Sequence, residues 1–172
     1  ASDLPGAMLA ADATLVARGP DGERRIGVDD FFEGMYATAL AEDELLTRIE
    51  LPSRPDVVGT YAKKPSPSSG YAMVGIAVAA TLDGGVVESV RVAANGVVDH
   101  GVRLGAVEEA LAGESLDEDT IAAAADVAGD DVEDWMVMDD TQASAAFRMQ
   151  LLSVYTERAL STVADRAGLV TA

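Results

Sequence analysis

Residues 60–97 read TYAKKPSPSSGYAMVGIAVAATLDGGVVESVRVAANGV and contain two apolar segments separated by a short turn. The pattern predicts a long apolar strand over residues 74–82, a turn at Asp83-Gly84-Gly85, and a return strand over residues 86–97. Glycine supplies the backbone conformations that a tight turn between antiparallel strands needs. A long β-hairpin is therefore the element around which the neighbouring segments are expected to pack.

The loop that leads into this hairpin carries an isolated positive charge. Lys63 and Lys64 are the only lysines in a chain whose formal net charge is −18, and Tyr61 and Tyr71 flank them. A cationic loop with aromatic neighbours on a rigid hairpin favours contact with a phosphate or an aromatic cofactor. The alternative is a solvated turn with two solubilising lysines.

Composition excludes several kinds of site. A length of 172 residues allows one domain or two small ones, and 49% hydrophobic residues exclude a disordered acidic tail. The chain has no cysteine, so disulfides, thiolate metal sites and a cysteine nucleophile are excluded. His100 is the only histidine, which excludes a multi-histidine metal site, and we interpret it as structural or exposed.

The acidity indicates which partners and environment suit the chain. Thirty Asp and Glu residues, spread along the whole sequence, face twelve Lys and Arg residues. Such a surface repels nucleic acid and anionic membranes. Because self-repulsion at this charge needs screening by salt, we interpret the source as a halophile. Without a signal peptide or a membrane-crossing apolar run, the chain is expected to be cytoplasmic.

The first third of the chain is expected to begin with a helix and continue with short strands. Ser2 or Asp3 would cap a helix that has Pro5 in its first turn. Residues 14–18 and 23–28 form a predicted hairpin, and residues 28–34 a short helical piece with Phe31 and Phe32 turned inward. Alternating apolar residues over 45–51 predict a half-buried strand.

The remainder is expected to be a separate domain of a sheet and helices. Prolines at 52 and 55 mark the boundary, which gives domains over residues 1–52 and 56–172. Helices are predicted over residues 102–112, 116–129 and 141–167. The last has an apolar stripe formed by Phe147, Leu151, Tyr155, Ala159 and Val163. The fold class is therefore α+β, with a three-stranded antiparallel sheet packed on a three-helix bundle.

No motif forms a catalytic constellation. The acidic pairs could be metal ligands or an acid–base couple, but most flank helix starts, where carboxylates act as caps. Gly84-Gly85 lies between two strands, so a turn is favoured over a phosphate loop. Trp135 is interpreted as an apolar anchor for an acidic loop. A carboxylate-based hydrolase is disfavoured because no base is paired with a nucleophile.

Seven short segments nevertheless occur in an order typical of one family. They are Ser2-Asp3-Leu4-Pro5, Asp12-Ala13-Thr14-Leu15, Phe31-Phe32-Glu33-Gly34, Asp43-Glu44-Leu45-Leu46 with Ile49-Glu50-Leu51-Pro52, Tyr61-Ala62-Lys63 with Gly70-Tyr71-Ala72-Met73-Val74, Arg103 with Glu108, Leu111 and Gly113, and Asp140 with Ser144-Ala145-Ala146-Phe147-Arg148 and Arg158-Ala159-Leu160. In this order they resemble the flavin subunit of the molybdenum hydroxylases, the family of the carbon monoxide dehydrogenase medium chain and its xanthine dehydrogenase relatives.

The resemblance implies a function and a set of site residues. In that family the subunit binds FAD and relays electrons from an iron–sulfur subunit to an acceptor, while a molybdenum subunit oxidises the substrate. By position, Asp3 would approach the adenosine part of FAD, and Leu46 and Tyr71 would lie by the isoalloxazine ring. Lys63, on the neighbouring strand, would take a charge role. The structural alternatives are a helix cap for Asp3, a core position for Leu46 and strand packing for Tyr71.

The resemblance also implies what residues 1–172 would lack. It starts just after the family's second glycine-rich flavin loop, so residues 1–52 match only part of the flavin-binding subdomain. Residues 65–69 replace the basic residues usual after the lysine. Backbone N–H groups of such loops commonly hold a pyrophosphate. FAD binding by these residues alone is therefore expected to be weak or absent. The alternative function is a non-catalytic assembly module that has lost flavin binding.

Overall fold

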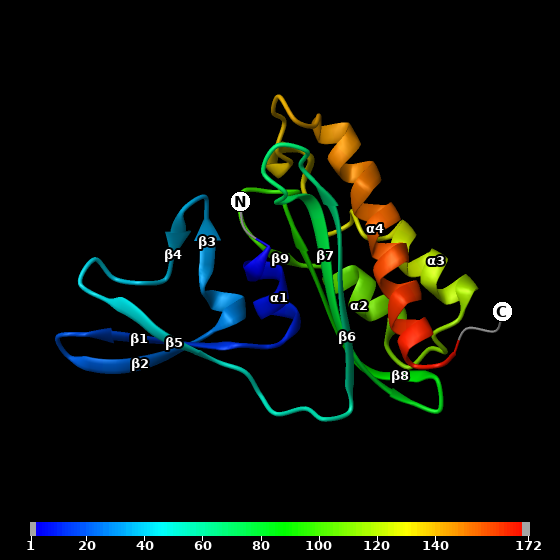
Figure 1. The fold of residues 1–172 in the computed structure, drawn as a ribbon, viewed down its shortest axis with the longest axis horizontal. Helices are drawn as coiled ribbons and strands as arrows, with labels where there is room; N and C mark the ends of the chain where they lie inside the picture. Colours follow the sequence, from blue (N-terminus) through cyan, green and yellow to red (C-terminus); the bar gives the residue numbers. More distant parts are fainter. Residues whose placement is uncertain (1–2, 170–172) are drawn as a thin grey trace.

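The computed structural model describes residues 3–169, so the predicted cap at Ser2 lies outside the described residues. It confirms the α+β class. The described residues form three antiparallel sheets: a small three-stranded sheet near the N-terminal end, a two-stranded hairpin, and a larger four-stranded sheet backed by helices (Figure 1). Among the described residues, no helix combines the length and apolar character that a membrane crossing requires.

The N-terminal region consists of one helix and three paired strands. Helix α1 covers Leu4–Ala10, and strands β1 (Thr14–Gly19), β2 (Gly22–Gly27) and β5 (Leu45–Glu50) pair in the order β2-β1-β5. Gly19 pairs with Gly22 across the predicted hairpin turn, which is confirmed. Gly22 has a φ of 115°, a conformation that favours glycine.

Between β2 and β5 the chain differs from the prediction. Only Val28–Asp30 form a helical turn, η1, and a small hairpin follows, made of β3 (Phe32–Gly34) and β4 (Ala37–Thr38). Tyr36 has a φ of 56° in the turn, which a helix would not allow. Phe31 is buried and packs edge-to-face on the partly buried Phe32, at 5.2 Å between ring centroids, so both rings are at least partly covered as expected.

Strand β5 is present as predicted, but the prediction that it is half-buried was wrong. Leu45 is 74% exposed, and Leu46 and Ile49 are also exposed. β5 is an edge strand that pairs only with β1 within the described residues. An alternating pattern shows that a strand has an apolar face but does not show what covers it.

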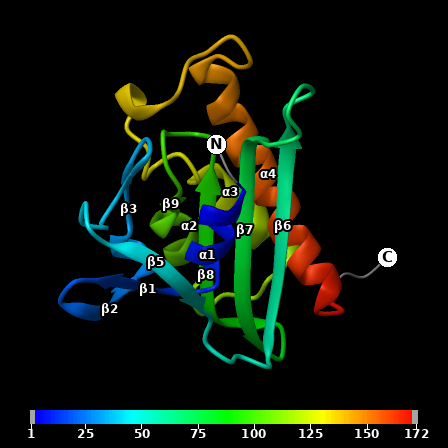
Figure 2. The same ribbon diagram turned by 60° about the vertical axis from the view of Figure 1, so that its left-hand side comes forward.

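The larger sheet has four strands, one more than the three predicted, and consists of the predicted hairpin and two flanking strands. Strands β6 (Val57–Pro65), β7 (Ala72–Asp83), β8 (Val86–Asn95) and β9 (Val102–Arg103) pair antiparallel in that order (Figure 2). The turn between β7 and β8 falls at Gly84 and Gly85, as expected, and both have positive φ. β9 occupies the predicted first turn of a helix, because Val102 and Arg103 pair with β8.

Three helices cover one face of this sheet, as predicted. They are α2 (Gly105–Leu111), α3 (Glu118–Asp126) and α4 (Ala145–Arg166). The Asp117 side chain accepts from the N–H of Thr120 at 2.9 Å, and Ser144 accepts from the N–H of Phe147 at 3.3 Å. These caps satisfy free N–H groups of the first turn and fix where each helix begins. The helices α3 and α4 therefore begin at Glu118 and Ala145, later than the predicted residues 116 and 141.

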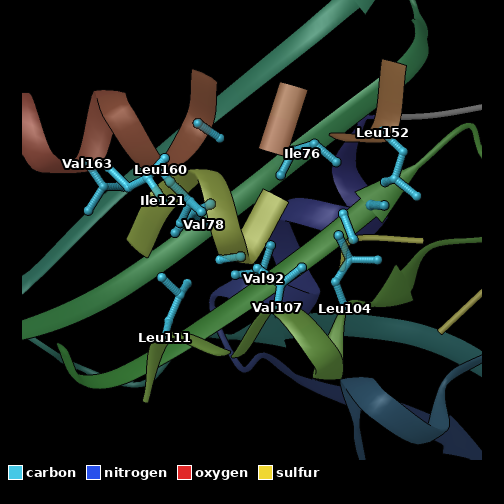
Figure 3. Packing of buried hydrophobic residues seen from close by; sticks show 14 of the residues in the cluster. Ile76, Val78, Val92, Leu104, Val107, Leu111, Ile121, Leu152, Leu160 and Val163 are labelled. Atoms are coloured by element: carbon cyan, nitrogen blue, oxygen red, sulfur yellow. The ribbon is translucent and has the colours of Figure 1, made fainter. Parts of the chain in front are cut away.

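The main core lies between this face and the helices (Figure 3). Ile76 and Val78 of β7 point toward α4, where Leu152, Leu160 and Val163 are fully buried. The opposite face of the sheet packs on α1 (Figure 2). β7 presents small residues there, including Gly75 and Ala77, so the alternation of large and small side chains lets helices pack on both faces.

Residues 127–144, between α3 and α4, form an irregular segment at one end of the molecule. The segment contains a helical turn, η2 (Asp134–Met136), within which Trp135 is 82% exposed. The prediction of Trp135 as an apolar anchor was therefore wrong. Val132 and Val137 are buried instead and fasten the segment to the core.

Candidate functional site

The Asp3 carboxylate joins the start of α1 to the first residue of β7, which directly follows Tyr71. Its Oδ1 accepts from the backbone N–H of Ala72 at 2.9 Å, and its Oδ2 accepts from Nζ of Lys63. The Lys63 Nζ also donates to the carbonyl oxygen of Gly70 at 2.9 Å. Although Asp3 precedes the first residue of α1, its side chain makes no capping hydrogen bond, so the predicted capping role was wrong.

The electrostatics favour an ionised Asp3. Burial alone would raise the pKa of the Asp3 carboxyl. The hydrogen bonds from Lys63 and from the Ala72 N–H lower it by more than burial raises it, so the pKa lies below its ordinary value. The carboxylate is therefore charged at neutral pH, and its bond to Lys63 is charge-assisted.

The buried Asn95 and the half-buried Tyr61 form a polar pair that supports the Asp3–Lys63 contact. The Asn95 side chain is 4% exposed; its Oδ1 accepts from the Gly6 N–H at 2.9 Å, and its Nδ2 donates to the Asp3 carbonyl at 3.0 Å and to the Tyr61 hydroxyl at 3.4 Å. A Cβ at Gly6 would overlap the Asn95 amide, and one at Gly75 would overlap the Tyr61 hydroxyl. Both glycines are thus required for the close approach.

The environment of Tyr61 keeps its hydroxyl protonated. Burial raises the pKa of Tyr61 to about 12, and the nearby Asp3 carboxylate acts in the same direction, whereas the Asn95 amide opposes it. A phenol with such a pKa is neutral at physiological pH and acts as a hydrogen-bonding support. It is not an acid–base group.

Residues 66–71 form a short closed loop next to the Asp3–Lys63 contact. The Ser66 N–H donates to the Tyr71 carbonyl at 2.7 Å, and the Gly70 N–H donates to the Ser66 carbonyl at 2.9 Å. Gly70 has a φ of 74°, which favours glycine. The Tyr71 N–H donates to Ser69 Oγ at 3.3 Å. The Tyr71 side chain is nevertheless 51% exposed, so its backbone is fixed while its ring is available for contact.

A cleft of about 360 Å³ opens beside this loop. It lies between the β3–β4 hairpin, the 66–71 loop, and the segments that follow β8 and η2. Its apolar wall includes Phe32, Met35, Tyr36, Tyr71, Met73 and Met138. The volume falls within the range of small-molecule sites.

The polar groups of this cleft are mostly engaged with one another. Arg148, 3% exposed, donates to the carbonyls of Met73 and Gly96 at 2.6 Å each and to Asp140 at 2.8 Å. The N–H groups of Gln142 and Ala143, followed by Arg148, hold the pKa of Asp140 below its usual range. Through its bonds to the Met73 and Gly96 carbonyls, Arg148 anchors α4 to the hairpin. Because Asp140 balances its charge, it leaves little positive potential for an anion.

His100 also has a local partner. Its Nδ1 lies 2.6 Å from Asp99 Oδ1, while the Asp99 Oδ2 accepts from the Met35 N–H at 3.1 Å. The hydrogen bond with His100 is the main cause that lowers the pKa of Asp99. The expectation of a structural or exposed histidine agrees with this partly buried position.

The structure brings three of the four predicted site residues together. Asp3 and Lys63 are in contact, and Tyr71 lies between the two backbone groups that they bind. Leu46 lies on β5 of the other sheet and does not line the cleft. The structural alternatives also fail for Leu46 and Tyr71, since both side chains are exposed and not packed in a core.

Sequence reasoning missed three residues that build the site. Asn95, Tyr61 and Arg148 are each held by partners that are distant in the chain, so no local pattern marks their roles. Asn95 offered the clearest signal, because an amide at the end of an apolar strand must find hydrogen bonds when it is buried.

The described residues suit one end of a flavin better than the other. The half-exposed Tyr71 ring offers stacking area for a planar heterocycle. For the pyrophosphate, residues 3–169 contain no glycine-rich loop that opens a helix, and Lys63 is already bonded to Asp3. Within the same residues, no group of three or more metal-ligating side chains was found. The arrangement therefore fits the ring end of FAD.

Comparisons with known proteins agree with this fit. A model described as the FAD binding domain in molybdopterin dehydrogenase matches residues 1–54. Another, described as the CO dehydrogenase flavoprotein C-terminal domain, matches residues 59–163. Both descriptions denote domains of dehydrogenases that use a flavin. Since the second match alone spans more than half of the sequence, the chain belongs to the CO dehydrogenase flavoprotein family, which confirms the resemblance.

Individual relatives are similar over nearly the whole chain. The glyceraldehyde dehydrogenase medium chain of Sulfolobus acidocaldarius is 30% identical over 164 residues, which is 95% of this chain and 57% of the relative. The carbon monoxide dehydrogenase medium chain of Hydrogenophaga pseudoflava is 31% identical over 128 residues, 74% of this chain and 45% of the relative. The chain thus spans about half the length of the curated relatives it matches.

Solved structures match the fold. A structure of carbon monoxide dehydrogenase from Hydrogenophaga pseudoflava, which lacks the Mo-pyranopterin moiety of the molybdenum cofactor, superposes with a TM-score of 0.89 at 30% identity and covers 95% of this chain and 56% of its own. Quinoline 2-oxidoreductase from Pseudomonas putida 86 gives a TM-score of 0.86 at 26% identity, with 98% and 57% covered.

Proposed function

We propose that residues 1–172 form the C-terminal portion of the FAD-binding subunit of a molybdenum-containing hydroxylase or dehydrogenase, such as carbon monoxide dehydrogenase. The subunit relays electrons from iron–sulfur clusters through FAD to an acceptor. The observation that carries the proposal is the exposed Tyr71 ring on a fixed backbone, in a chain that an FAD-binding model and a flavoprotein model match in succession.

Each predicted site residue has a role in this proposal. Tyr71 lies against the isoalloxazine ring, where its side chain supplies stacking area and limits the access of water. Leu46 also lies by the isoalloxazine ring, Lys63 contributes positive charge, and Asp3 approaches the adenosine part. When bound, FAD supplies one- and two-electron redox chemistry.

The proposal also assigns domains, partners and a compartment. Residues 1–52 complete a flavin-binding subdomain and residues 56–172 form the C-terminal domain. The molybdenum cofactor and the iron–sulfur clusters belong to partner subunits of a hetero-oligomer that does not bind nucleic acid. The net charge of −18 supports a halophilic cytoplasm as its environment.

A second candidate is a non-catalytic assembly module of such a complex that has lost flavin binding. It is favoured by large apolar side chains that are exposed on the β3–β4 hairpin and on η2. Tyr36 is 95% exposed, and Met35 and Trp135 are also exposed. Exposed aromatic and methionine side chains are typical of protein interfaces.

Flavin content separates the two candidates. The chain is purified in its native complex, and the FAD per chain is measured by absorbance after denaturation, beside a fluorescence titration of residues 1–172 alone. We expect stoichiometric FAD in the complex and weak or absent binding by the isolated residues. A native complex without flavin would overturn the electron-transfer proposal and leave the assembly module.

A substitution then tests the residue on which the proposal depends. Tyr71→Ala in the native complex is expected to weaken FAD retention and to shift the flavin potential while the fold is preserved. Tyr71→Phe is the matched control, because it keeps the ring and removes only the hydroxyl. Unchanged flavin content and potential in Tyr71→Ala would remove Tyr71 from the flavin site.

A further inference from the structure

Two side chains hold the backbone on either side of Tyr71. Lys63 donates to the carbonyl of Gly70, the residue before Tyr71, and Asp3 accepts from the N–H of Ala72, the residue after it. Lys63 and Asp3 are in turn bonded to each other. These three interactions form a closed bracket around one exposed aromatic residue.

Within the 66–71 loop, two backbone hydrogen bonds close the turn on itself, from the Ser66 N–H to the Tyr71 carbonyl and from the Gly70 N–H to the Ser66 carbonyl. The loop's other side-chain bonds join its own members, Ser66 to Ser68 and the Tyr71 N–H to Ser69. Among the described residues, Asp3 and Lys63 are the side chains from outside the loop that hydrogen-bond residues 69–72. Serine-rich loops without such contacts have many accessible conformations.

The bracket also has a rigid base. The Asp3 carbonyl accepts from the buried amide of Asn95, and that amide in turn contacts the Tyr61 hydroxyl. The side chains of Lys63 and Asp3 are only 32% and 27% exposed, so the pair is better shielded from water than an ordinary surface ion pair. A bracket anchored in a buried network holds its loop in one geometry.

We propose that the Asp3–Lys63 bracket positions Tyr71, and that these two residues act on the isoalloxazine ring of a bound flavin through Tyr71 and not by direct contact with that ring. Both Asp3 oxygens already accept hydrogen bonds from the protein, so the carboxylate is committed to the loop. The inference rests on the proposed function for its flavin part, whereas the bracket itself is a property of residues 3–72.

The first test measures the loop without any flavin. Hydrogen–deuterium exchange of residues 66–72 is followed in the 172-residue chain for the wild type, Asp3→Ala, Asp3→Asn and Lys63→Met. Asp3→Ala removes the acceptor of the Ala72 N–H, and Lys63→Met releases the Gly70 carbonyl and so loosens the loop; each is expected to speed exchange there about tenfold. Asp3→Asn keeps an acceptor for the Ala72 N–H, so its effect is expected to be smaller.

A matched variant controls for the loss of any ion pair. Arg48→Met removes the pair between Arg48 and Glu23 in the N-terminal sheet, whose members are 50% and 44% exposed. It is expected to leave exchange at residues 66–72 unchanged. Unchanged loop exchange in both Asp3→Asn and Lys63→Met would overturn the bracket, even if Asp3→Ala failed to fold.

The second test asks whether the bracket acts through Tyr71. In the native complex, Asp3→Ala and Lys63→Met are expected to shift the flavin potential in the same direction as Tyr71→Ala, by a smaller amount. Adding Asp3→Ala to Tyr71→Ala is expected to produce no further shift, because coupled residues are not additive. An Asp3→Ala shift of full size in the Tyr71→Ala background would mean direct contact and would overturn the positioning role.

The two tests fail in different ways. A loop that loosens while flavin content and potential stay constant would retain the bracket and reject the proposed flavin role of Tyr71. A flavin response without any change in loop exchange would retain the flavin site and reject the bracket.

Discussion

Strand β5 carries alternating apolar residues and strand β7 a continuous apolar segment, yet β5 is exposed to solvent and β7 is buried. In β7, Ile76 and Val78 are fully buried between the sheet and α4. In β5, Leu45 and Ile49 are exposed along the edge of the small sheet. The difference lies in what covers each strand: β7 has a neighbour on both edges and helices on both faces, whereas β5 has one neighbouring strand.

The comparison indicates that the two regions are stabilised by different interactions. The large sheet and its helices enclose a continuous core. The small sheet relies on a smaller cluster around Leu15, Ile26 and Phe31, which also includes Ala93 of β8. Ion pairs cross its surface, such as Arg24 with Glu44 at 2.6 Å. Because burial of apolar surface is the larger contribution to stability, the C-terminal region is expected to dominate unfolding.

The largest expected effect follows from this difference. Leu160→Ala in α4 removes a fully buried side chain and should lower the free energy of unfolding by about 2–5 kcal/mol. Leu45→Ala makes the same chemical change in exposed β5 and should cost below about 1 kcal/mol. Urea unfolding followed by circular dichroism measures both. Equal losses would mean that β5 is covered in solution and that the two regions do not differ as described.

The second prediction concerns the contact between β6 and β7 at the base of the site. Gly75→Ala places a methyl group on the Tyr61 hydroxyl and, at 3.0 Å, on the Ala72 Cβ, so it should destabilise the chain by about 1–3 kcal/mol. Gly27→Ala is the control in the small sheet, since its nearest neighbour is 3.8 Å away and its φ is −62°. Thermal melting compares the two variants.

A rescue experiment sharpens the same prediction. Tyr61→Phe removes the hydroxyl that a Cβ at position 75 would meet, so the double variant should regain part of the stability lost by Gly75→Ala. No recovery would place the cost of Gly75→Ala elsewhere than at Tyr61.

The sequence predicted the helices, strands and turns better than it predicted which side chains would be covered by neighbouring parts of the chain. The turns at residues 19–22 and 83–85, the strand at β5 and the long C-terminal helix follow from glycine positions and apolar periodicity, which are local properties. The exposure of Leu45 and Trp135 depends on what lies beside them, and a pattern along the chain carries no such information. The hydrogen bonds that build the site could not be predicted for the same reason, because Asp3 bonds Ala72 across 69 positions and Asn95 bonds Gly6 across 89.

Salt should affect the two regions unequally. Between Leu104 and Phe147 the sequence contains many acidic residues and neither lysine nor arginine, whereas the small sheet pairs Arg48 with Glu23 and Glu50. The Debye length falls from about 10 Å at 0.1 M to about 3 Å at 1 M salt, so repulsion in the helical segment and attraction in the small sheet both weaken.

We therefore expect the melting temperature to rise by several degrees between 0.1 M and 1 M KCl, because acidic repulsion dominates at this net charge. Hydrogen exchange should slow most in α2 and α3 and least in β1, β2 and β5. A melting temperature independent of salt would contradict the halophilic interpretation, and uniform slowing would contradict the regional difference.

The smallest expected effect lies where the two regions join. Asp29 of η1 accepts from Arg91 of β8 at 2.6 Å and from Arg103 of β9 at 3.2 Å. Burial raises the pKa of the Asp29 carboxyl, but the two arginines outweigh it and leave the pKa below its ordinary value. Since the carboxyl is more acidic in the folded chain, its contribution to stability is fully present above about pH 4 and is lost as the pH falls through the lowered pKa.

Asp29→Asn should therefore cost about 1 kcal/mol at pH 7, a modest value because the Asp29 side chain is 48% exposed. The difference between the variant and the wild type should shrink as the pH is lowered below about 4, where the wild-type carboxyl also becomes neutral. Urea unfolding at a series of pH values measures this difference, and Asp21→Asn in the β1–β2 turn, which has no ion-pair partner among the described residues, is the control. If the cost of Asp29→Asn were the same at pH 3 and pH 7, the charge of Asp29 would contribute nothing to the joint. The joint would then rest on the packing of α1 against β7 and β8, on the small cluster that includes Ala93, and on the other bonds between the regions, such as that of Asn95 with Gly6.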